Sequence, residues 1–214
     1  LKRFCLKRRS SQPRTGPSKR MEWLSAWLRC CVAREESRRR VHVVFMGPAS
    51  SGASSLLQRA PSGKEGPGGV ESHFAMRDVD VTAWDVGHVS SCEVKQSCFA
   101  KAEAVAFVVD STADLREAQS MLRELLAEEE LRSCRLLVLA NKQDESGAKS
   151  LEEIDRRLEL QKIRGRRWIL HAASAAQGFG VEESLEWLRE ELKDAPPETP
   201  TPTKRARLTR RGGG

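Results

Sequence analysis

The stretch "VHVVFMGPASSGASSLL" (41–57) joins an apolar run to a glycine loop and then to a helix-forming segment. Gly47 and Gly52 have the Gly-x4-Gly spacing of a loop whose backbone N–H groups, together with the dipole of the following helix, bind phosphate. The full motif continues with a lysine for the outer phosphates and a Ser or Thr for magnesium. Here Ala53 takes the lysine position and Ser54 keeps the hydroxyl. On its own, this degenerate motif also fits an ordinary glycine turn between a strand and a helix.

The rest of the chain alternates strands and helices. Two short segments, 70–77 and 79–84, flank Asp78 and predict a hairpin. Apolar runs then alternate with amphipathic segments, which predicts an α/β fold with a mostly parallel sheet covered by helices on both faces. The expected strands are 104–110, 134–140 and 166–174, and the expected helices are 54–60, 114–130, 151–160 and 181–192.

Charge separates the ends of the chain from its middle. The net charge is +7, yet residues 41–194 hold nineteen Lys/Arg against twenty-six Asp/Glu. Residues 1–40 hold thirteen basic residues against three acidic ones, and residues 195–214 hold five against one. We therefore predict one domain with basic ends, and we expect it to be a monomer. The predicted parts are a disordered extension (1–20), an amphipathic helix (21–34), the domain (35–194) and a disordered tail (195–214).

The segment "EWLSAWLRCCV" (22–32) carries the membrane prediction. Its two Trp and two Leu residues fall on one face of a helix, and arginines flank it. No apolar run approaches the ~20 residues of a membrane span, so we expect peripheral contact. Cys30 and Cys31 are candidate palmitoylation sites, although two ordinary reduced thiols fit the sequence equally well. None of the six cysteines has the paired spacing of a zinc site.

The sequence "ANKQD" (140–144) follows an apolar strand and is the more specific signal. The carboxylate of Asp144 can accept both the N1–H and the exocyclic amine of guanine, a pattern that adenine does not offer. Asn141 and the stem of Lys142 can frame the same base. The alternative, a polar turn after a strand, does not explain why the motif follows a phosphate-type loop at this distance.

These motifs together resemble the ADP-ribosylation-factor-like (Arf-like) family of small GTPases. The resemblance covers about residues 22–193, and its best stretches are "WDVG" (84–87), "VVDSTADLREAQSMLRELLAEEELRSCRLLVLANKQD" (108–144) and "AASAAQGFGVEESLEWL" (172–188). It implies the P-loop NTPase small GTPase fold, with a six-stranded sheet and five surrounding helices. It also implies bound GTP or GDP with Mg²⁺, effector and exchange-factor proteins as partners, and an N-terminal helix that engages membrane in the GTP state.

The resemblance assigns roles to individual positions. Asn141, Lys142 and Asp144 would hold guanine, and the backbone of Ser174, Ala175 and Ala176 would cover its oxygen. Magnesium would be bound directly by Ser54 and through water by Asp85. The backbone of residues 47–55 would hold the phosphates. The nucleotide-binding residues at this end would be Gly47, Ser51, Gly52, Ala53, Ser54, Ser55 and, after the "WDV" stretch, Gly87.

Departures from the family pattern gather at the phosphate end. After Asp85 the family has x-Gly-Gly-Gln, whereas this chain has His88 and Val89 at the last two positions. The glutamine of the family orients the attacking water. The side chain of Val89, which replaces it, can neither donate nor accept a hydrogen bond. No Thr stands between Ala60 and Val70, so the threonine that closes over magnesium is missing as well. We therefore expect a weakened magnesium site and strongly impaired hydrolysis.

Three functions compete at this point. The first is an Arf-like GTP-binding protein of the cytoplasm and of Golgi or other endomembranes, which acts in vesicle-mediated transport with weak or absent hydrolysis. The second is a pseudo-GTPase scaffold without nucleotide switching. The third is a nucleic-acid binder that works through the basic tail, which we do not expect because short basic tails are mostly solvated.

Overall fold

The computed structural model describes residues 38–60, 64–65, 71–87 and 89–193, and from Arg39 these residues belong to one compact unit. Predictions for residues 1–20, 21–34 with Cys30 and Cys31, and 195–214 concern residues outside these ranges, and His88 lies outside them as well. Among the described residues, no helix has both the length and the apolar character needed to cross a membrane.

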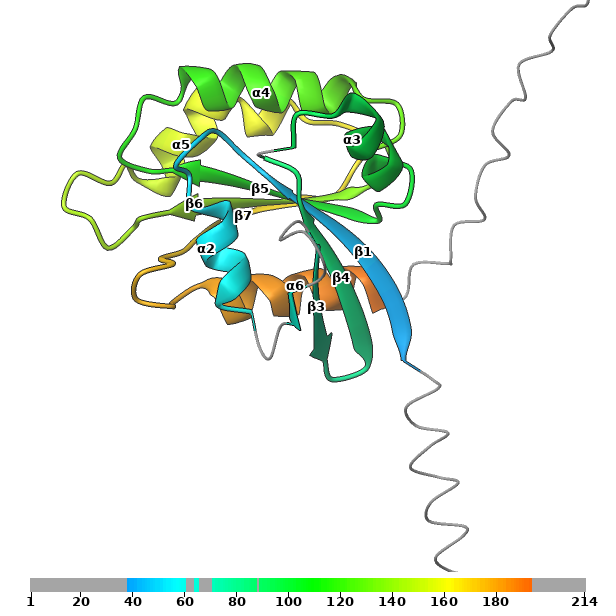
Figure 1. Ribbon diagram of the computed structural model, residues 1–214. Helices are drawn as coiled ribbons and strands as arrows, with labels where there is room; N and C mark the ends of the chain where they lie inside the picture. The colour runs from blue at the N-terminus through cyan, green and yellow to red at the C-terminus, as the bar shows by residue number, and fades with distance from the viewer. Residues whose placement is uncertain (1–37, 61–63, 66–70, 88, 194–214) are drawn as a thin grey trace, which may run out of the picture. The chain divides into compact units, whose positions relative to one another are not determined.

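A single sheet organises the described residues (Figure 1). The strand order is β2-β3-β4-β1-β5-β6-β7. Strands β4, β1, β5, β6 and β7 are parallel to one another, whereas β3 pairs antiparallel with β4 and β2 pairs antiparallel with β3. The bounds are β1 Arg39–Met46, β2 Lys64–Glu65, β3 Glu71–Met76, β4 Val79–Asp85, β5 Ala104–Asp110, β6 Arg135–Asn141 and β7 Trp168–Ala172.

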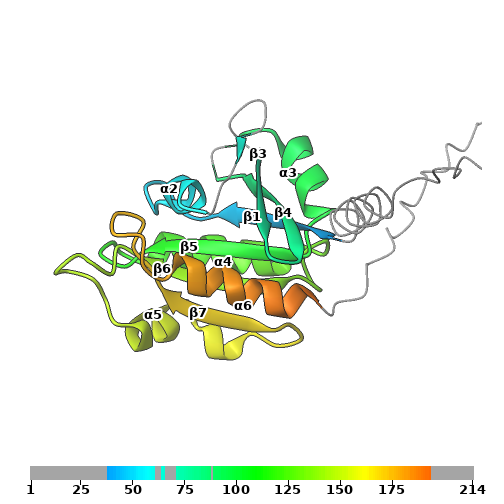
Figure 2. The ribbon, with the colours of Figure 1, turned by 90° about the horizontal axis from the view of Figure 1, so that it is seen from below.

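Helices cover both faces of this sheet, as the sequence predicts. Helices α2 and α6 lie on one face, and α3, α4 and α5 lie on the other (Figure 1). Seen from below, α6 crosses in front of the strands and α4 lies behind them (Figure 2). The bounds are α2 Ala53–Gln58, α3 Cys92–Phe99, α4 Arg116–Ala127, α5 Leu151–Leu158, the 3-10 turn η1 Leu160–Lys162, and α6 Val181–Lys193.

The apolar pattern of each element explains its place. Every residue of β5 except the last is buried, as a central parallel strand requires. In α6, Leu185, Leu188 and Leu192 follow helical spacing and face the sheet, and Leu122 and Leu125 do the same for α4. The predicted fold class is confirmed. The six expected strands are β1 and β3 to β7, and the two-residue β2 adds a short seventh strand at the edge.

Two helices differ from the sequence-based expectation. Helix α3 was not predicted, because only Cys98 and Phe99 of its eight residues are buried and its apolar periodicity is weak. Its one local signal is Ser91, whose hydroxyl accepts a hydrogen bond from the Val94 N–H at 3.4 Å. Helix α5 ends two residues earlier than predicted, since Glu159 adopts a left-handed conformation with φ of 58°.

Two half-buried histidines make stability depend on pH. The imidazole of His42 in β1 stacks on Trp84 with 4.9 Å between ring centroids, and that of His171 in β7 lies 3.0 Å from the Ser184 hydroxyl. Burial lowers the pKa of both rings below the ordinary value; Lys101 and Arg40 lower the pKa of His42 further. Just below about pH 6.5, the ordinary pKa of histidine, the unfolded chain therefore binds more protons than the folded chain. The free energy of unfolding is lower there as a result.

We therefore expect the free energy of unfolding to be constant near pH 8 and to fall as the pH drops from about 6.5 toward 5. Because both rings are partly exposed, the slope for each should stay well below the limit of about 1.4 kcal/mol per pH unit. Urea unfolding at several pH values measures it. His42→Phe keeps a ring on Trp84 without a titrating group and should flatten the profile. An unchanged profile in that variant would show that His42 does not contribute.

Candidate nucleotide-binding site

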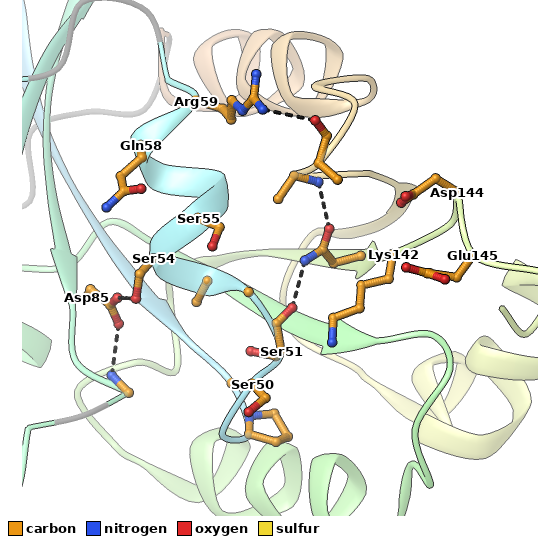
Figure 3. A pocket seen from close by; sticks show the side chains of 18 residues that line it. Ser50, Ser51, Ser54, Ser55, Gln58, Arg59, Asp85, Lys142, Asp144 and Glu145 are labelled. Carbon is orange, nitrogen blue, oxygen red and sulfur yellow. Dashed lines mark hydrogen bonds between the residues drawn. The ribbon is translucent and has the colours of Figure 1, made fainter. Parts of the chain in front are cut away.

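A cavity of about 920 Å³ opens at the edge of the sheet where the parallel strands end. Ligands of open α/β sheets bind at this edge, and the volume suits a nucleotide. Its walls come from four segments that follow β1, β4, β6 and β7 (Figure 3). The lining residues are Gly47, Pro48, Ser50, Ser51, Gly52, Ala53, Ser54, Ser55, Gln58, Arg59, Asp85, Gly87, Asn141, Lys142, Asp144, Glu145, Ala175 and Ala176.

Two positions of the first loop have no room for a side chain and therefore require glycine. A Cβ atom at Gly47 would lie 2.1 Å from the carbonyl oxygen of Val108. Gly52 has φ of 88°, and a Cβ atom there would lie 2.2 Å from Nδ2 of Asn141. The carbonyl of Gly52 accepts the first helical bond of α2, from the Leu56 N–H at 2.9 Å. The loop therefore enters α2 as a phosphate-binding loop does, with the unpaired N–H groups of the first helical turn at the cavity wall.

Two oxygen donors converge beside this loop. The hydroxyl of Ser54 donates a hydrogen bond to the carboxylate of Asp85, whose other oxygen accepts from the Gly87 N–H at 3.2 Å (Figure 3). A hydroxyl and a carboxylate are the hard oxygen ligands that Mg²⁺ prefers. Within the part of the chain that the structure describes, no group of three or more His, Cys, Asp or Glu residues gathers to hold a metal. The pair thus fits a magnesium ion whose other ligands are phosphate and water.

Asn141 joins the two halves of the site. Its side chain is buried, with Nδ2 donating to the Ser51 carbonyl at 2.7 Å and Oδ1 accepting from the Ala175 N–H at 2.9 Å. Ser51 belongs to the phosphate loop, and Ala175 belongs to the loop after β7 (173–180). Asn141 therefore fixes the distance between the loop that would hold phosphate and the loop that would cover the base.

Lys142 and Asp144 form the next part of the wall. Lys142 has φ of 63°, and its ammonium group pairs with the Asp110 carboxylate at 2.6 Å. Burial alone would raise the pKa of Asp110, but hydrogen bonds from Lys142 and Thr112 hold it below the ordinary value. The carboxylate of Asp144 lines the cavity and has no partner among the described residues. It is therefore available to accept hydrogen bonds from a ligand.

The loop after β7 places an open backbone donor, the N–H of Ala176, at the cavity. The Ser174 N–H bonds to the Phe179 carbonyl at 3.1 Å, and the Ala175 N–H bonds to Asn141. Within the described ranges the Ala176 N–H has no partner, and Ala176 lines the cavity. Of the three backbone groups predicted to cover the base, only that of Ala176 is free to meet a ligand. Ser174 instead supports the loop, since its hydroxyl accepts from the Gln177 N–H at 3.0 Å.

The structure brings all the residues predicted for nucleotide and magnesium, except Ser174, to one cavity, and Pro48 and Ser50 of the predicted loop 47–55 line it as well. Three further residues line it that the sequence did not indicate: Gln58, Arg59 and Glu145. Glu145 directly follows Asp144, so the base motif could have suggested it. For Gln58 and Arg59 there was no sequence signal, because both follow the recognised motif.

Two side chains at the phosphate end lack the charge or the polar group that the family has there, and the structure shows where both lie. Ala53 lines the cavity at the first position of α2 and presents only a methyl group. Val89 packs against the core formed by α3, α4 and α5, and its N–H bonds to the Val86 carbonyl at 3.2 Å. Neither side chain can neutralise phosphate charge or hold a water molecule.

Comparison with known proteins gives a consistent result. The model of the ADP-ribosylation factor family matches residues 30–192. ADP-ribosylation factor-like protein 1 of Saccharomyces cerevisiae is 34% identical over 166 residues, which are 74% of this chain and 91% of that protein. ADP-ribosylation factor-like protein alp41 of Schizosaccharomyces pombe is 34% identical over 164 residues, or 73% and 88%.

A solved structure agrees with the sequence relatives. The Arl6 BBS3 small GTPase of Trypanosoma brucei, with the bound nucleotide analogue GppNp, superposes with a TM-score of 0.63 at 26% identity, covering 72% of this chain and 98% of that one. Fold, motif order and sequence relatives therefore agree, and this chain belongs to the ADP-ribosylation factor family of small GTPases.

Proposed function

We propose that this protein binds guanine nucleotides, hydrolyses GTP weakly or not at all, and acts through partner proteins in intracellular transport. The observation that carries the proposal is the contrast between the two ends of one cavity. At the base end, Asn141 connects both loops and Asp144 presents a free carboxylate. At the phosphate end, Ala53 and Val89 stand where charge and water positioning are needed.

Binding and hydrolysis make different demands on these groups. The glycine loop, the Ser54–Asp85 pair and the base end are enough to place a nucleotide. Hydrolysis needs an oriented water molecule and stabilisation of the charge on the transferring phosphate, which together contribute several orders of magnitude in rate. We therefore expect the protein to retain nucleotide binding while its rate of GTP hydrolysis is low.

The membrane part of the proposal rests on sequence alone. Residues 21–34 combine aromatic and aliphatic side chains on one helical face with flanking arginines, a composition that favours the surface of anionic membranes. We propose a cytoplasmic protein that attaches peripherally to endomembranes through this segment, with effector and exchange-factor proteins as its partners.

Restoring the missing cation should strengthen triphosphate binding. We expect Ala53→Lys to tighten GTP binding roughly 10- to 100-fold, since one charge-assisted contact contributes about 1.5–3 kcal/mol. Titration of a non-hydrolysable GTP analogue with magnesium measures the change. Ala53→Met is the matched control, because it adds comparable length without charge. Equal affinities of the two variants would mean that the loop does not present phosphate to this position.

The catalytic part is tested by single-turnover hydrolysis of bound GTP. The native chain is compared with the double variant Ala53→Lys/Val89→Gln, which returns a cation and a water-positioning amide. We expect the double variant to hydrolyse bound GTP at least about tenfold faster. A native chain that matches the double variant, with both hydrolysing bound GTP much faster than free GTP hydrolyses in the same buffer, would contradict impaired hydrolysis. A folded native chain that retains no guanine nucleotide would favour the pseudo-GTPase scaffold instead.

A further inference from the structure

Arg59 makes a contact across the cavity that the family motifs do not include. It follows the last residue of α2, and its guanidinium donates to the carbonyl oxygen of Ala176 at 2.9 Å. The two residues are 117 positions apart in the chain. Figure 3 shows the Arg59 side chain reaching from the end of α2 toward the loop after β7. Arg59 therefore makes a second connection between the helix of the phosphate loop and the loop at the base end.

This contact falls on one particular peptide group. The peptide that joins Ala176 to Gln177 has its carbonyl bound by Arg59 and its N–H bound by the Ser174 hydroxyl at 3.0 Å. On the other side, the Ala175 N–H is bound by Asn141 at 2.9 Å. The peptide between Ala175 and Ala176 is thus flanked by two anchored groups. It carries the Ala176 N–H, which has no partner among the described residues and belongs to a residue that lines the cavity.

We infer that Arg59 is a positioning residue for base recognition: by holding the Ala176 carbonyl, it fixes the Ala176 N–H where it can donate to the carbonyl oxygen of guanine. The inference rests on the proposed guanine binding. It differs from a phosphate role for Arg59, because the observed hydrogen bond is to the base-side loop, and Arg59 lies a full α2 length beyond the glycine loop. Positioned donors discriminate between ligands because a misplaced donor loses most of its hydrogen bond.

The test compares GDP with 6-thioguanosine diphosphate, which keeps the N1–H and the amine but replaces the 6-oxygen by sulfur, a weak hydrogen-bond acceptor. The full chain, Arg59→Ala, Arg59→Lys and Arg116→Ala are titrated with both ligands. Arg116→Ala is the control, since Arg116 is an exposed arginine outside the cavity lining. Thermal unfolding without nucleotide checks that each variant folds.

We expect Arg59→Ala to weaken GDP binding about threefold to tenfold, the loss of one hydrogen bond, and to leave the analogue nearly unaffected. Arg59→Lys should recover much of the affinity, because an ammonium can donate to the same carbonyl. An equal loss for both ligands would overturn the inference and place Arg59 at the ribose or phosphate, and so would no loss for GDP. If the native folded chain binds neither ligand, the proposed guanine binding itself fails.

Discussion

Asp144→Asn is expected to weaken GDP binding by about 10²- to 10⁴-fold. The carboxylate of Asp144 lines the cavity and has no partner in the part of the chain that the structure describes, so its oxygens can accept the N1–H and the exocyclic amine of guanine together. Two charge-assisted hydrogen bonds contribute about 1.5–3 kcal/mol each, and the amide of Asn replaces one acceptor by a donor that faces the guanine amine. Titration of GDP into nucleotide-free protein measures the loss.

The same substitution should favour a different base. Xanthine carries a carbonyl where guanine carries the exocyclic amine, so the Asn amide can donate to it. We expect Asp144→Asn to bind xanthosine diphosphate more tightly than GDP. Glu145→Gln is the matched control, because Glu145 also lines the cavity and loses the same charge. Unchanged GDP affinity in Asp144→Asn, or an equal effect in Glu145→Gln, would remove Asp144 from base recognition.

Asn141→Ala is expected to lower the free energy of unfolding by about 2–4 kcal/mol. The side chain is 1% exposed, and its loss leaves the Ser51 carbonyl and the Ala175 N–H without their partner. Each unsatisfied buried group costs about 1–3 kcal/mol, reduced where water can enter from the cavity. Because Asn141 also sets the distance between the two loops, nucleotide affinity should fall together with stability. Denaturant unfolding with and without GDP measures both.

Gln143→Ala separates a local stability effect from a site effect. Gln143 donates to the Ser111 hydroxyl at 2.7 Å and to the Lys149 carbonyl at 3.0 Å, but it does not line the cavity. This variant should lose stability while the folded protein keeps its GDP affinity. If both variants weakened GDP binding equally, the bridging role of Asn141 would be disproved.

The sheet could be predicted because its strands are apolar throughout. Residues 104–109 and 136–141 are buried on both faces, and a run of that kind between amphipathic helices has few other solutions. The two-residue β2 could not be predicted, because its antiparallel pairing with β3 supplies the order that a glycine-rich loop lacks. Helix α3 was missed for a related reason, since it buries too little apolar surface to give a pattern.

The sequence likewise predicts the part of the site that lies in one contiguous stretch, but not the contacts between residues far apart in the chain. Asn141, Lys142 and Asp144 were predicted because they are contiguous and follow a strand, so their chemistry can be read locally. The Asn141 bridge and the Arg59 contact could not be predicted, since they join residues 34 to 117 positions apart. The same holds for Arg189 of α6, a buried arginine that pairs with Asp78 at the β3–β4 turn at 2.9 Å.

Guanine binding by a cavity that lacks the phosphate-loop lysine is tested most directly by calorimetric titration of GDP and ADP, each with and without magnesium. The protein is the full chain, stripped of nucleotide and shown to be folded. We predict magnesium-dependent binding of GDP at micromolar or tighter concentration and no measurable binding of ADP. No heat of binding with millimolar GDP, or equal binding of the two nucleotides, would contradict the assignment of this cavity as a guanine-nucleotide site.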